Sequence, residues 1–272
     1  MPELPEMENY RKMLSASILN IPISNVIVNR DKSINVPPAE FSASLMGSKV
    51  IFVERRGKYL IFHLNNGRRL LLHLMLGGLL YMTRGDEERP SRTTQIEISF
   101  GDKVLYFIGL RLGYLHQLSA KETEEALSQL GPELLDRRMT KERFVSLMKK
   151  RRGALKSLLV NQQASAGIGN CYADEIAFHA KIHPASKVQN LTNETLEQLY
   201  ESIHHVLKEA TEGGGYMEMP FTEDDDLTGH YADQCKIYDH EGEPCVRCGT
   251  SIVKTEITGR KVFLCPNCQH EM

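Results

Sequence analysis

Four cysteines near the carboxyl end of the sequence have the spacing of a metal site. Cys245 and Cys248 form one CxxC pair, and Cys265 and Cys268 form a second pair after sixteen intervening residues. Two such pairs supply four thiolates to one Zn²⁺, and a site with four protein ligands has no open position for a substrate. The sequence therefore predicts one structural zinc ion, with four ordinary thiols as the alternative. A disulfide framework is disfavoured because the first residues show no export signal.

The amino terminus could supply a nucleophile. Removal of Met1 would leave Pro2 with a free secondary amine, and an α-amino group has a pKa of about 7.7–8.0, so a fraction is neutral near pH 7. A neutral amine can attack an electrophilic carbon and form a Schiff base. Glu3 and Glu6 follow, and a helix beginning at Pro5 would hold them near the amine, where a carboxyl can donate or accept a proton. Taken alone, the same residues also fit a helix whose acidic first turn stabilises its dipole.

Residues 151–180 predict a phosphate-binding turn between two helices. Gly167 and Gly169 would expose backbone N–H groups just before a helix N-terminus, an arrangement that binds phosphate without side-chain charge. Within residues 136–163, nine Lys and Arg stand against two Asp and Glu, a local charge of +7. A helical hairpin with a basic surface is the alternative. Arg260, on a turn between the cysteine pairs, could hold another phosphate as a fork or be a solvated turn residue.

The elements that would position these groups differ between the two halves. Residues 5–19 predict a helix, and short apolar or alternating runs then occur at 49–54, 58–64, 68–74, 95–100 and 103–108. Arg56-Gly57, Asn65-Asn66-Gly67 and Gly101-Asp102 separate several of these runs, and Asn-Gly is a strong hairpin signal. The first half therefore predicts an antiparallel sandwich or barrel.

The second half is predominantly helical. Its pattern predicts helices at 140–150, 154–162, 172–180 and 192–212, and a hairpin of strands 251–257 and 261–264 turned by residues 258–260. Residues 213–231 lie between them and have four glycines, one proline and no period. A loop of this length without structure of its own is uncommon and is usually functional or mobile.

Composition excludes several classes of protein. The chain has 272 residues, 41% apolar and 25% charged, which indicates a globular protein of one large or two ordinary domains. No apolar run reaches the roughly 18 residues that span a bilayer. The net charge of −2 alone argues against a nucleic-acid binder, whose domain is usually basic. That charge is an average, because the basic stretch at 136–163 is offset by seven acidic and no basic residues at 209–226.

Several motifs occur together in a fixed order. They are PELPE at 2–6, RRGKYL at 55–60, HLMLGG at 73–78, AGIGNCYADE at 166–175 and the cysteine-rich tail. With them the whole chain resembles the bacterial formamidopyrimidine-DNA glycosylase and endonuclease VIII family. The resemblance implies an α+β multidomain protein: an N-terminal antiparallel β-sandwich with flanking helices (1–131), a helix–two-turns–helix DNA-binding domain (132–234) that includes a lesion-flap loop (213–231), and a zinc hairpin (235–272). DNA would lie in the cleft between the two halves.

The same resemblance implies a bifunctional DNA glycosylase and AP lyase of base-excision repair. Pro2 would attack C1′ of a flipped-out damaged nucleotide, Glu3 would protonate the sugar ring oxygen, and Glu6 would support proton handling or lesion contacts. The Schiff base would then permit β- and δ-elimination. Lys58 matches a phosphate contact that takes part in the lyase step, although a strand-edge surface lysine fits the bare sequence equally well. Arg260 matches one member of a phosphate clamp.

The remaining DNA contacts are also implied by the resemblance. Asn170 would complete the clamp, Leu76 would fill the gap left by the flipped base, and Arg111 would contact the backbone. The other expected DNA-binding residues are Arg152, Lys156 and Gly169. The implied partner is double-stranded DNA with damaged bases or abasic sites, bound by a cytoplasmic, nucleoid-associated monomer with no membrane contact.

Three departures from the family pattern concern specificity. Leu110 stands where an arginine reads the base opposite the lesion, and Leu112 replaces a wedge phenylalanine. An aliphatic side chain cannot hydrogen-bond a cytosine edge, so a preference for lesions opposite cytosine is not predicted. Thr93 lies near the place of a family histidine. The acidic run 223–226 is either simply solvated or, beside phosphates, keeps the flap open or favours a cationic lesion.

Two other functions are alternatives to this one. A lesion- or DNA-structure-binding protein on the same scaffold, with weak or no base excision, fits the altered wedge residues. Retention of Pro2, Glu3 and Lys58 argues against it. A metal-dependent hydrolase is disfavoured, because four thiolates leave the zinc no open position. Cys171 and Cys235 have no assigned role and are expected to be buried thiols.

Overall fold

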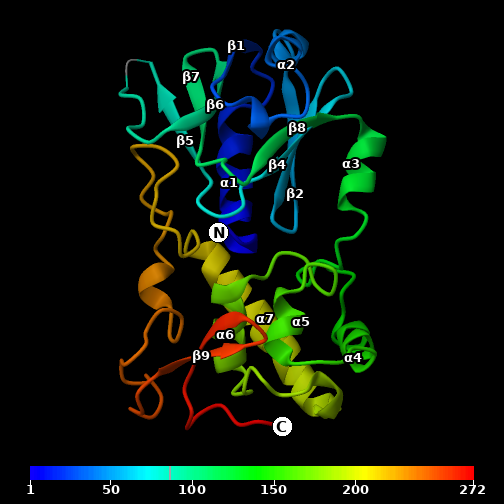
Figure 1. The fold of residues 1–272 in the computed structure, drawn as a ribbon, viewed down its shortest axis with the longest axis vertical. Coiled ribbons are helices and arrows are strands. Elements are labelled where there is room, and N and C mark those ends of the chain that lie inside the picture. The colour runs from blue at the N-terminus through cyan, green and yellow to red at the C-terminus, as the bar shows by residue number, and fades with distance from the viewer. Residues whose placement is uncertain (86) are drawn as a thin grey trace. The chain divides into compact units, whose positions relative to one another are not determined.

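The structure, a computed structural model, describes residues 1–85 and 87–272 and divides into two compact units. The first unit comprises residues 1–129 and 213–230, and the second comprises residues 130–212 and 231–272 (Figure 1). Across the described ranges, none of the helices combines the length and apolar character needed to cross a membrane.

The first unit is an antiparallel β-sandwich with helices beside it. Its elements are α1 (Leu4–Ser17), β1 (Ile23–Val28), η1 (Asp31–Ser33), α2 (Pro38–Leu45), β2 (Val50–Arg56), β3 (Tyr59–Leu64), β4 (Arg69–His73), β5 (Leu79–Arg84), β6 (Thr94–Phe100), β7 (Lys103–Ile108), β8 (Tyr114–Leu118) and α3 (Ala120–Leu127). One four-stranded sheet has the order β1-β6-β7-β5 and the other has the order β2-β3-β4-β8. The predicted sandwich and its five predicted strands are confirmed, while β1, β5 and β8 are additional.

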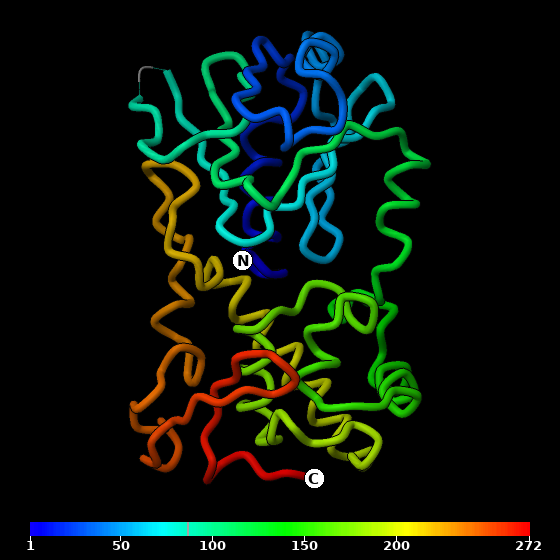
Figure 2. Tube along the Cα trace, viewed as in Figure 1, coloured from blue at the N-terminus to red at the C-terminus, as the bar shows by residue number. Residues whose placement is uncertain are grey.

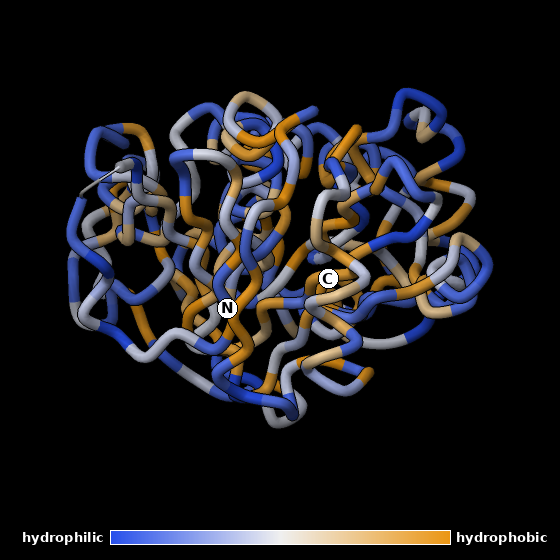
Figure 3. The backbone as a smooth tube through the Cα atoms, turned by 90° about the horizontal axis from the view of Figure 1, so that it is seen from above, coloured by the Kyte–Doolittle hydropathy of each residue, from blue (hydrophilic) through white to orange (hydrophobic). Residues whose placement is uncertain are grey.

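Turn glycines and a shared core explain this arrangement. Gly57, Gly67 and Gly101 have φ values of 57°, 84° and 63°, a left-handed conformation that glycine adopts without steric cost and that tight hairpins require. Both sheets contribute side chains to one hydrophobic core, and α1 adds Met7 and Leu14, each fully buried. Figure 3 shows hydrophobic segments along several strands and helices, while many turns at the edge of the view are hydrophilic.

The second unit contains the helices and the cysteine hairpin. Its elements are α4 (Lys141–Lys149), α5 (Leu155–Val160), α6 (Asn170–His179), η2 (Val188–Asn190), α7 (Asn193–Glu212), η3 (Ala232–Gln234), β9 (Val253–Ile257) and β10 (Arg260–Leu264). Thr140 accepts a hydrogen bond from the Arg143 amide and caps α4. Thr258 and Gly259, with φ of 50° and 75°, turn the β9–β10 hairpin. These elements confirm the four predicted helices and the predicted hairpin.

The segment 213–230 packs with the first unit, although its place in the chain had suggested the helical domain. The Met82 amide of β5 donates to the Phe221 carbonyl at 2.7 Å, and Asn9 of α1 donates to the Thr228 hydroxyl at 2.8 Å. Figure 2 shows this yellow-orange segment returning to the strands of the sandwich. The expected boundary placed this segment in the helical domain, whereas the structure groups it with the sandwich. The order of residues along the chain does not reveal the hydrogen bond to β5.

Candidate functional site

The amino-terminal residues are held in the interior of the first unit. Pro2 is buried, Glu3 is 2% exposed and Glu6 is 3% exposed. The Glu3 amide donates to Glu6 Oε2 at 2.7 Å, and the Tyr216 amide donates to Glu6 Oε1 at 2.9 Å. Pro2, Glu3 and Glu6 are thus all buried at the start of α1, and the Glu6 carboxylate is held by two backbone amides. Tyr216 was not predicted, since it lies 210 residues from Glu6.

Lys58 lies in the turn between β2 and β3 and is only 4% exposed. Burial, and to a lesser degree the positive charge of Lys58, lowers the pKa of His73 of β4 to about 4. The His73 ring stacks on Tyr59 with centroids 4.2 Å apart and meets the edge of Tyr114 at 5.9 Å. These three rings lie on neighbouring strands β3, β4 and β8. With a pKa of about 4, His73 is neutral near pH 7. The sequence placed His73 in a motif but did not reveal this register.

Leu76 and Leu112, the residues expected near the gap left by a flipped base, border a cavity of about 660 Å³ in the first unit. Leu76 is 67% exposed and Leu112 is 62% exposed, and Arg111 lines the same cavity. Leu110 does not reach this surface, because its side chain is 0% exposed in the sandwich core. The side chain of Leu110 therefore offers no group to a base, in line with the expectation that it cannot replace a base-reading arginine. Its amide donates to Gln95 Oε1 at 2.9 Å.

The glycine turn that the sequence predicts before a helix N-terminus is present in the second unit. Asn170 begins α6, and Gly169 is the preceding cap residue with extended backbone. The Gln162 side chain spans the turn: its Oε1 accepts from the Gly167 amide at 2.9 Å and its Nε2 donates to the Ile168 carbonyl at 2.7 Å. This bracing fixes the backbone at the start of α6, where amide groups can face an anion.

Lys156 corrects the expected list of DNA contacts. Its side chain is 0% exposed, and Nζ donates to Asp174 Oδ1 at 2.7 Å and to the Asn170 carbonyl at 2.8 Å. Asp174 Oδ2 also accepts from the Phe263 amide of β10 at 3.2 Å. An ammonium enclosed in this way supports the α6 turn from inside and does not reach a phosphate. Arg152, by contrast, is exposed.

A second buried carboxylate joins α6 to the chain that follows the loop. Glu175 accepts hydrogen bonds from the backbone amides of Lys236, Ile237 and Tyr238, at 2.9–3.1 Å. Burial raises its pKa, while these amides act in the opposite direction. Arg260 begins β10 and is exposed beside the turn, as expected. Glu175 was missed because its partners lie 61–63 residues away.

The four cysteines fit a zinc ion. Their Sγ atoms all lie within 4.8 Å of one another, with Cys245–Cys268 at 3.9 Å and Cys248–Cys265 at 3.6 Å. A tetrahedron with Zn–S bonds of about 2.3 Å has edges of about 3.8 Å, which these separations match. Cys171 and Cys235 are buried, as expected for these two thiols.

The acidic run of the loop is not uniform. Glu223, Asp224 and Asp226 are exposed, but Asp225 is half-buried and accepts hydrogen bonds from Phe221 and Thr228. Asp225 is therefore a hydrogen-bonded residue of the turn, and the expectation of a uniformly solvated run does not hold for it. The segment is folded onto the sandwich in the structure.

Comparisons with known proteins identify one family along the chain. The model of the formamidopyrimidine-DNA glycosylase N-terminal domain matches residues 1–114, that of its H2TH domain matches residues 130–220, and that of the zinc finger found in FPG and IleRS matches residues 242–270. The formamidopyrimidine-DNA glycosylase of Listeria innocua is 36% identical and that of Pelotomaculum thermopropionicum is 34% identical. Each alignment covers 99% of this chain, and 100% and 99% of the relative.

Solved structures agree over the same length. A complex of the Lactococcus lactis protein with DNA containing an abasic site has a TM-score of 0.89 at 28% identity, covering 99% of this chain and 100% of that one. A complex of MutM with DNA containing carbocyclic 8-oxo-G has a TM-score of 0.88 at 28% identity and the same coverage.

The sandwich, the helix–two-turns–helix module and the four-cysteine hairpin together define a zinc-containing DNA glycosylase of base-excision repair. The chain belongs to the formamidopyrimidine-DNA glycosylase family, whose members also cleave DNA at abasic sites. DNA is its partner, and the four cysteines hold a structural zinc.

Proposed function

We propose that the chain removes oxidatively damaged bases from double-stranded DNA through a Schiff base on Pro2 and then nicks the strand by β,δ-elimination. The observation that carries this proposal is the buried N-terminal group, in which Pro2 is followed by Glu3 and by a Glu6 carboxylate fixed by two backbone amides. Listeria relatives named formamidopyrimidine-DNA glycosylases support the lesion class.

The chemistry follows from these groups. The Pro2 amine, freed by removal of Met1, attacks C1′, and the bond from C1′ to the damaged base breaks as the base leaves with a proton. Glu3 protonates the ring oxygen, so the sugar opens and an iminium forms at C1′. The iminium acidifies the C2′ proton; its loss expels the 3′ phosphate, and a second elimination expels the 5′ phosphate. Lys58 assists this lyase step.

The second unit supplies the proposed phosphate contacts. Arg260 and Asn170 clamp phosphates, and Gly169 and Arg152 add contacts at the α6 turn and its approach. Each contributes mainly sequence-independent affinity, because phosphates carry no base identity. In the first unit, Arg111 contacts the backbone and Leu76 fills the gap left by the flipped base.

We also propose that selection of the opposite base is relaxed. With Leu110 in the core, no guanidinium at that position can pair with a cytosine edge. The exposed leucines Leu76 and Leu112 fill space without hydrogen-bonding any base. A repair enzyme works where the chromosome lies, so we propose a cytoplasmic, nucleoid-associated monomer; light scattering and cell fractionation test these two points.

Borohydride trapping tests the mechanism. Processed protein, shown by intact mass to lack Met1, is incubated with an abasic-site duplex and reduced, and a covalent adduct is expected. The matched control is the same chain with Met1 retained, because its Pro2 nitrogen is then an amide and cannot form an iminium.

Each outcome decides between the two functions that the sequence leaves open. No adduct with processed protein, together with tight binding to the lesion duplex, would identify a lesion-binding protein instead of an enzyme. A panel of oxidised purines and pyrimidines, each opposite all four bases, then defines the substrate. Excision rates that differ more than about tenfold between opposite bases would contradict relaxed selection.

A further inference from the structure

Three residues on one face of α1 contact the segment 213–230. Glu6, Asn9 and Tyr10 are spaced three and four residues apart, which places their side chains on the same side of a helix. Glu6 Oε1 accepts from the Tyr216 amide at 2.9 Å, and Asn9 Nδ2 donates to the Thr228 hydroxyl at 2.8 Å. The Tyr10 ring meets the ring of Phe221 edge to face, with centroids 5.9 Å apart. The segment is therefore attached to the helix that carries the proposed catalytic carboxylates.

The close contact with Glu6 depends on the absence of a side chain at position 215. Gly215 has φ of 81°, and a Cβ added there would lie only 2.8 Å from Cγ and Cδ of Glu6 and would also collide with Oε1. The backbone of the segment thus lies directly against the carboxylate, with the amide of the next residue donating to it. Because Glu6 Oε2 accepts from the Glu3 amide, the carboxylate is fixed at both oxygens.

Asp225 holds the segment in this shape. Its Oδ2 accepts from the Phe221 amide at 2.7 Å and from the Thr228 hydroxyl at 2.6 Å, and its Oδ1 accepts from the amides of Leu227 and Thr228 at 3.2 and 3.1 Å. Burial alone would raise the pKa of Asp225, but these hydrogen bonds outweigh it and lower the pKa. The Thr228 hydroxyl, in turn, accepts from Asn9 of α1.

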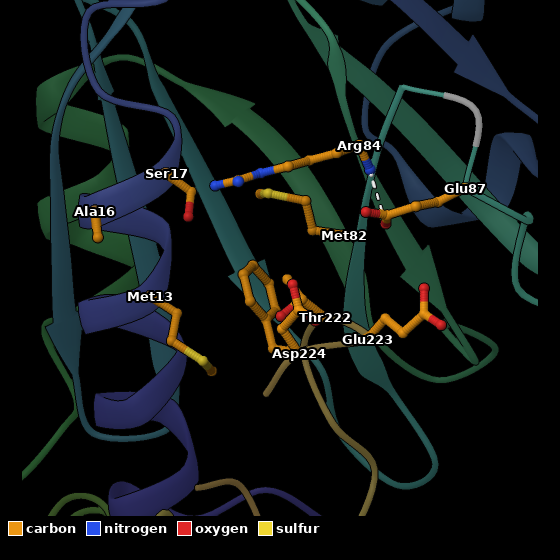
Figure 4. A pocket seen from close by; sticks show the side chains of 10 residues that line it. Met13, Ala16, Ser17, Met82, Arg84, Glu87, Thr222, Glu223 and Asp224 are labelled. Carbon is orange, nitrogen blue, oxygen red and sulfur yellow. Dashed lines mark hydrogen bonds between the residues drawn. The ribbon is translucent and has the colours of Figure 1, made fainter. Parts of the chain in front are cut away.

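Phe221 anchors the same turn in the sandwich. Its side chain is 1% exposed and belongs to the main hydrophobic core, and its carbonyl accepts from the Met82 amide at 2.7 Å. A pocket of about 240 Å³ lies beside it (Figure 4), where Met13 of α1 and Met82 of β5 face residues 222–224 of the segment. Asp224 lies on the rim of this pocket and is exposed, so the hydrogen-bonded turn depends on Asp225 and not on its acidic neighbour.

We propose that the segment 213–230 is a positioning element for base excision, in which Asp225 and Gly215 are the positioning residues. Asp225 folds the segment against α1, and the bare Cα of Gly215 lets the Tyr216 amide hold the Glu6 carboxylate. This inference rests on the proposed role of Glu6 beside Pro2. The acidic run then acts through one hydrogen-bonded side chain and not through its total charge.

Single neutralising substitutions separate position from charge. Asp225→Asn removes one charge and places an amide donor opposite the Phe221 amide and the Thr228 hydroxyl, whereas Asp224→Asn and Asp226→Asn remove the same charge from exposed side chains. Single-turnover excision is measured at saturating enzyme on a duplex with one formamidopyrimidine lesion. Asp225→Asn is expected to slow excision at least about tenfold, since small misplacements near a reacting centre cost this much or more. The two controls are expected to stay within about twofold of wild type.

A second pair of variants acts directly on Glu6. Gly215→Ala introduces the collision with the carboxylate, and Gly67→Ala is its control, with a similar φ of 84° but no atom within 4 Å of the added Cβ. Gly215→Ala is expected to slow excision as Asp225→Asn does, while the dissociation constant for the lesion duplex changes less than about threefold. Gly67→Ala is expected to match wild type at 25 °C.

The outcomes distinguish this inference from the function on which it rests. Failure of wild-type protein to form the borohydride adduct removes the proposed function. Active wild-type protein with equal excision rates for the three aspartate variants overturns the positioning role alone. An equal loss of excision rate in all three aspartate variants would assign the effect to charge and would also overturn the positioning role. A loss seen only as a lower melting temperature, with normal single-turnover rates for the folded protein, assigns Asp225 a purely structural role.

Discussion

The buried Lys156–Asp174 pair offers a direct test of the structure against the family resemblance. The substitution Lys156→Met keeps most of the side-chain length and apolar volume but removes the cation. Both side chains of the pair are 0% exposed, so Asp174 would be left in the interior without its partner. Breaking a buried pair in this way costs about 3–5 kcal/mol, because the remaining carboxyl must either stay charged without a partner or take up a proton. A loss of this size lowers the melting temperature by on the order of 10 °C.

The pH dependence of this loss has a defined sign. Burial raises the pKa of Asp174 to about 7 even with Lys156 present, and removal of the cation raises it further. A carboxyl whose folded-state pKa is raised holds a proton that the unfolded chain releases. Its contribution to the free energy of unfolding is therefore present at low pH and is lost as pH rises through the folded-state pKa. The stability difference between Lys156→Met and wild type is expected to widen above about pH 7, by up to ~1.4 kcal/mol per pH unit.

The assays are urea unfolding at pH 6 and pH 8 and the salt dependence of binding to an abasic-site duplex. Arg152→Gln is the matched control, because Arg152 is exposed in the same basic stretch. One lost phosphate contact lowers the slope of log K against log salt by about 0.9. We expect that change for Arg152→Gln with unchanged stability, and an unchanged slope for folded Lys156→Met. A Lys156→Met protein of normal stability with a reduced slope would refute the buried role and restore Lys156 as a phosphate contact.

Three further predictions concern the zinc, the stacked histidine and the exposed wedge. Removing zinc with a chelator is expected to unfold the β9–β10 hairpin, since structural zinc supplies roughly 10–16 kcal/mol in small zinc domains; rapid proteolysis next to Arg260 reports this, and a protease-resistant zinc-free hairpin would contradict it. His73 has a pKa of about 4 against an ordinary value of 6.5, so the unfolded chain binds the proton first and stability falls as pH drops from 6.5 toward 4. Unfolding free energies from pH 7 to 4.5 should show a flatter slope for His73→Gln. Leu112→Ala should leave the melting temperature within about 2 °C, because surface changes cost little, yet slow excision from duplex DNA; unchanged excision would exclude Leu112 as a wedge.

Local patterns predicted the parts of the fold that local physics determines. The paired CxxC motifs predicted the zinc ligands, and glycines such as Gly67 predicted the hairpins, because a left-handed turn depends on a few adjacent residues. The strand β8 was missed, since its sequence YLHQL is short and its burial comes from pairing with β4. β-structure of this kind depends on partners distant in sequence, and propensity alone is weak evidence for it.

The site shows the same division between local and distant information. The resemblance located Pro2, Glu3 and Glu6, and the helix that presents them could be read from Pro5 onward. The Tyr216 amide on Glu6 could not be predicted, because the two residues are 210 positions apart and an amide carries no sequence signature. Leu110 shows the converse limit. Its position in the motif is clear. Whether its side chain faces the core or the surface depends on the local backbone conformation, which the motif alone does not reveal.

Counting basic residues overestimates the number of phosphate contacts, as the basic stretch 136–163 shows. Of its nine basic side chains, Lys156 is buried against Asp174, Arg138 pairs with Asp136 at 2.7 Å, and Lys141 pairs with Glu201 at 2.6 Å. The two surface pairs are weak and can be exchanged for phosphate, whereas the buried pair cannot without exposing Asp174. The salt dependence of DNA binding should therefore reflect fewer contacts than the local charge of +7 suggests, and Arg138→Gln should reduce the slope where Lys156→Met does not.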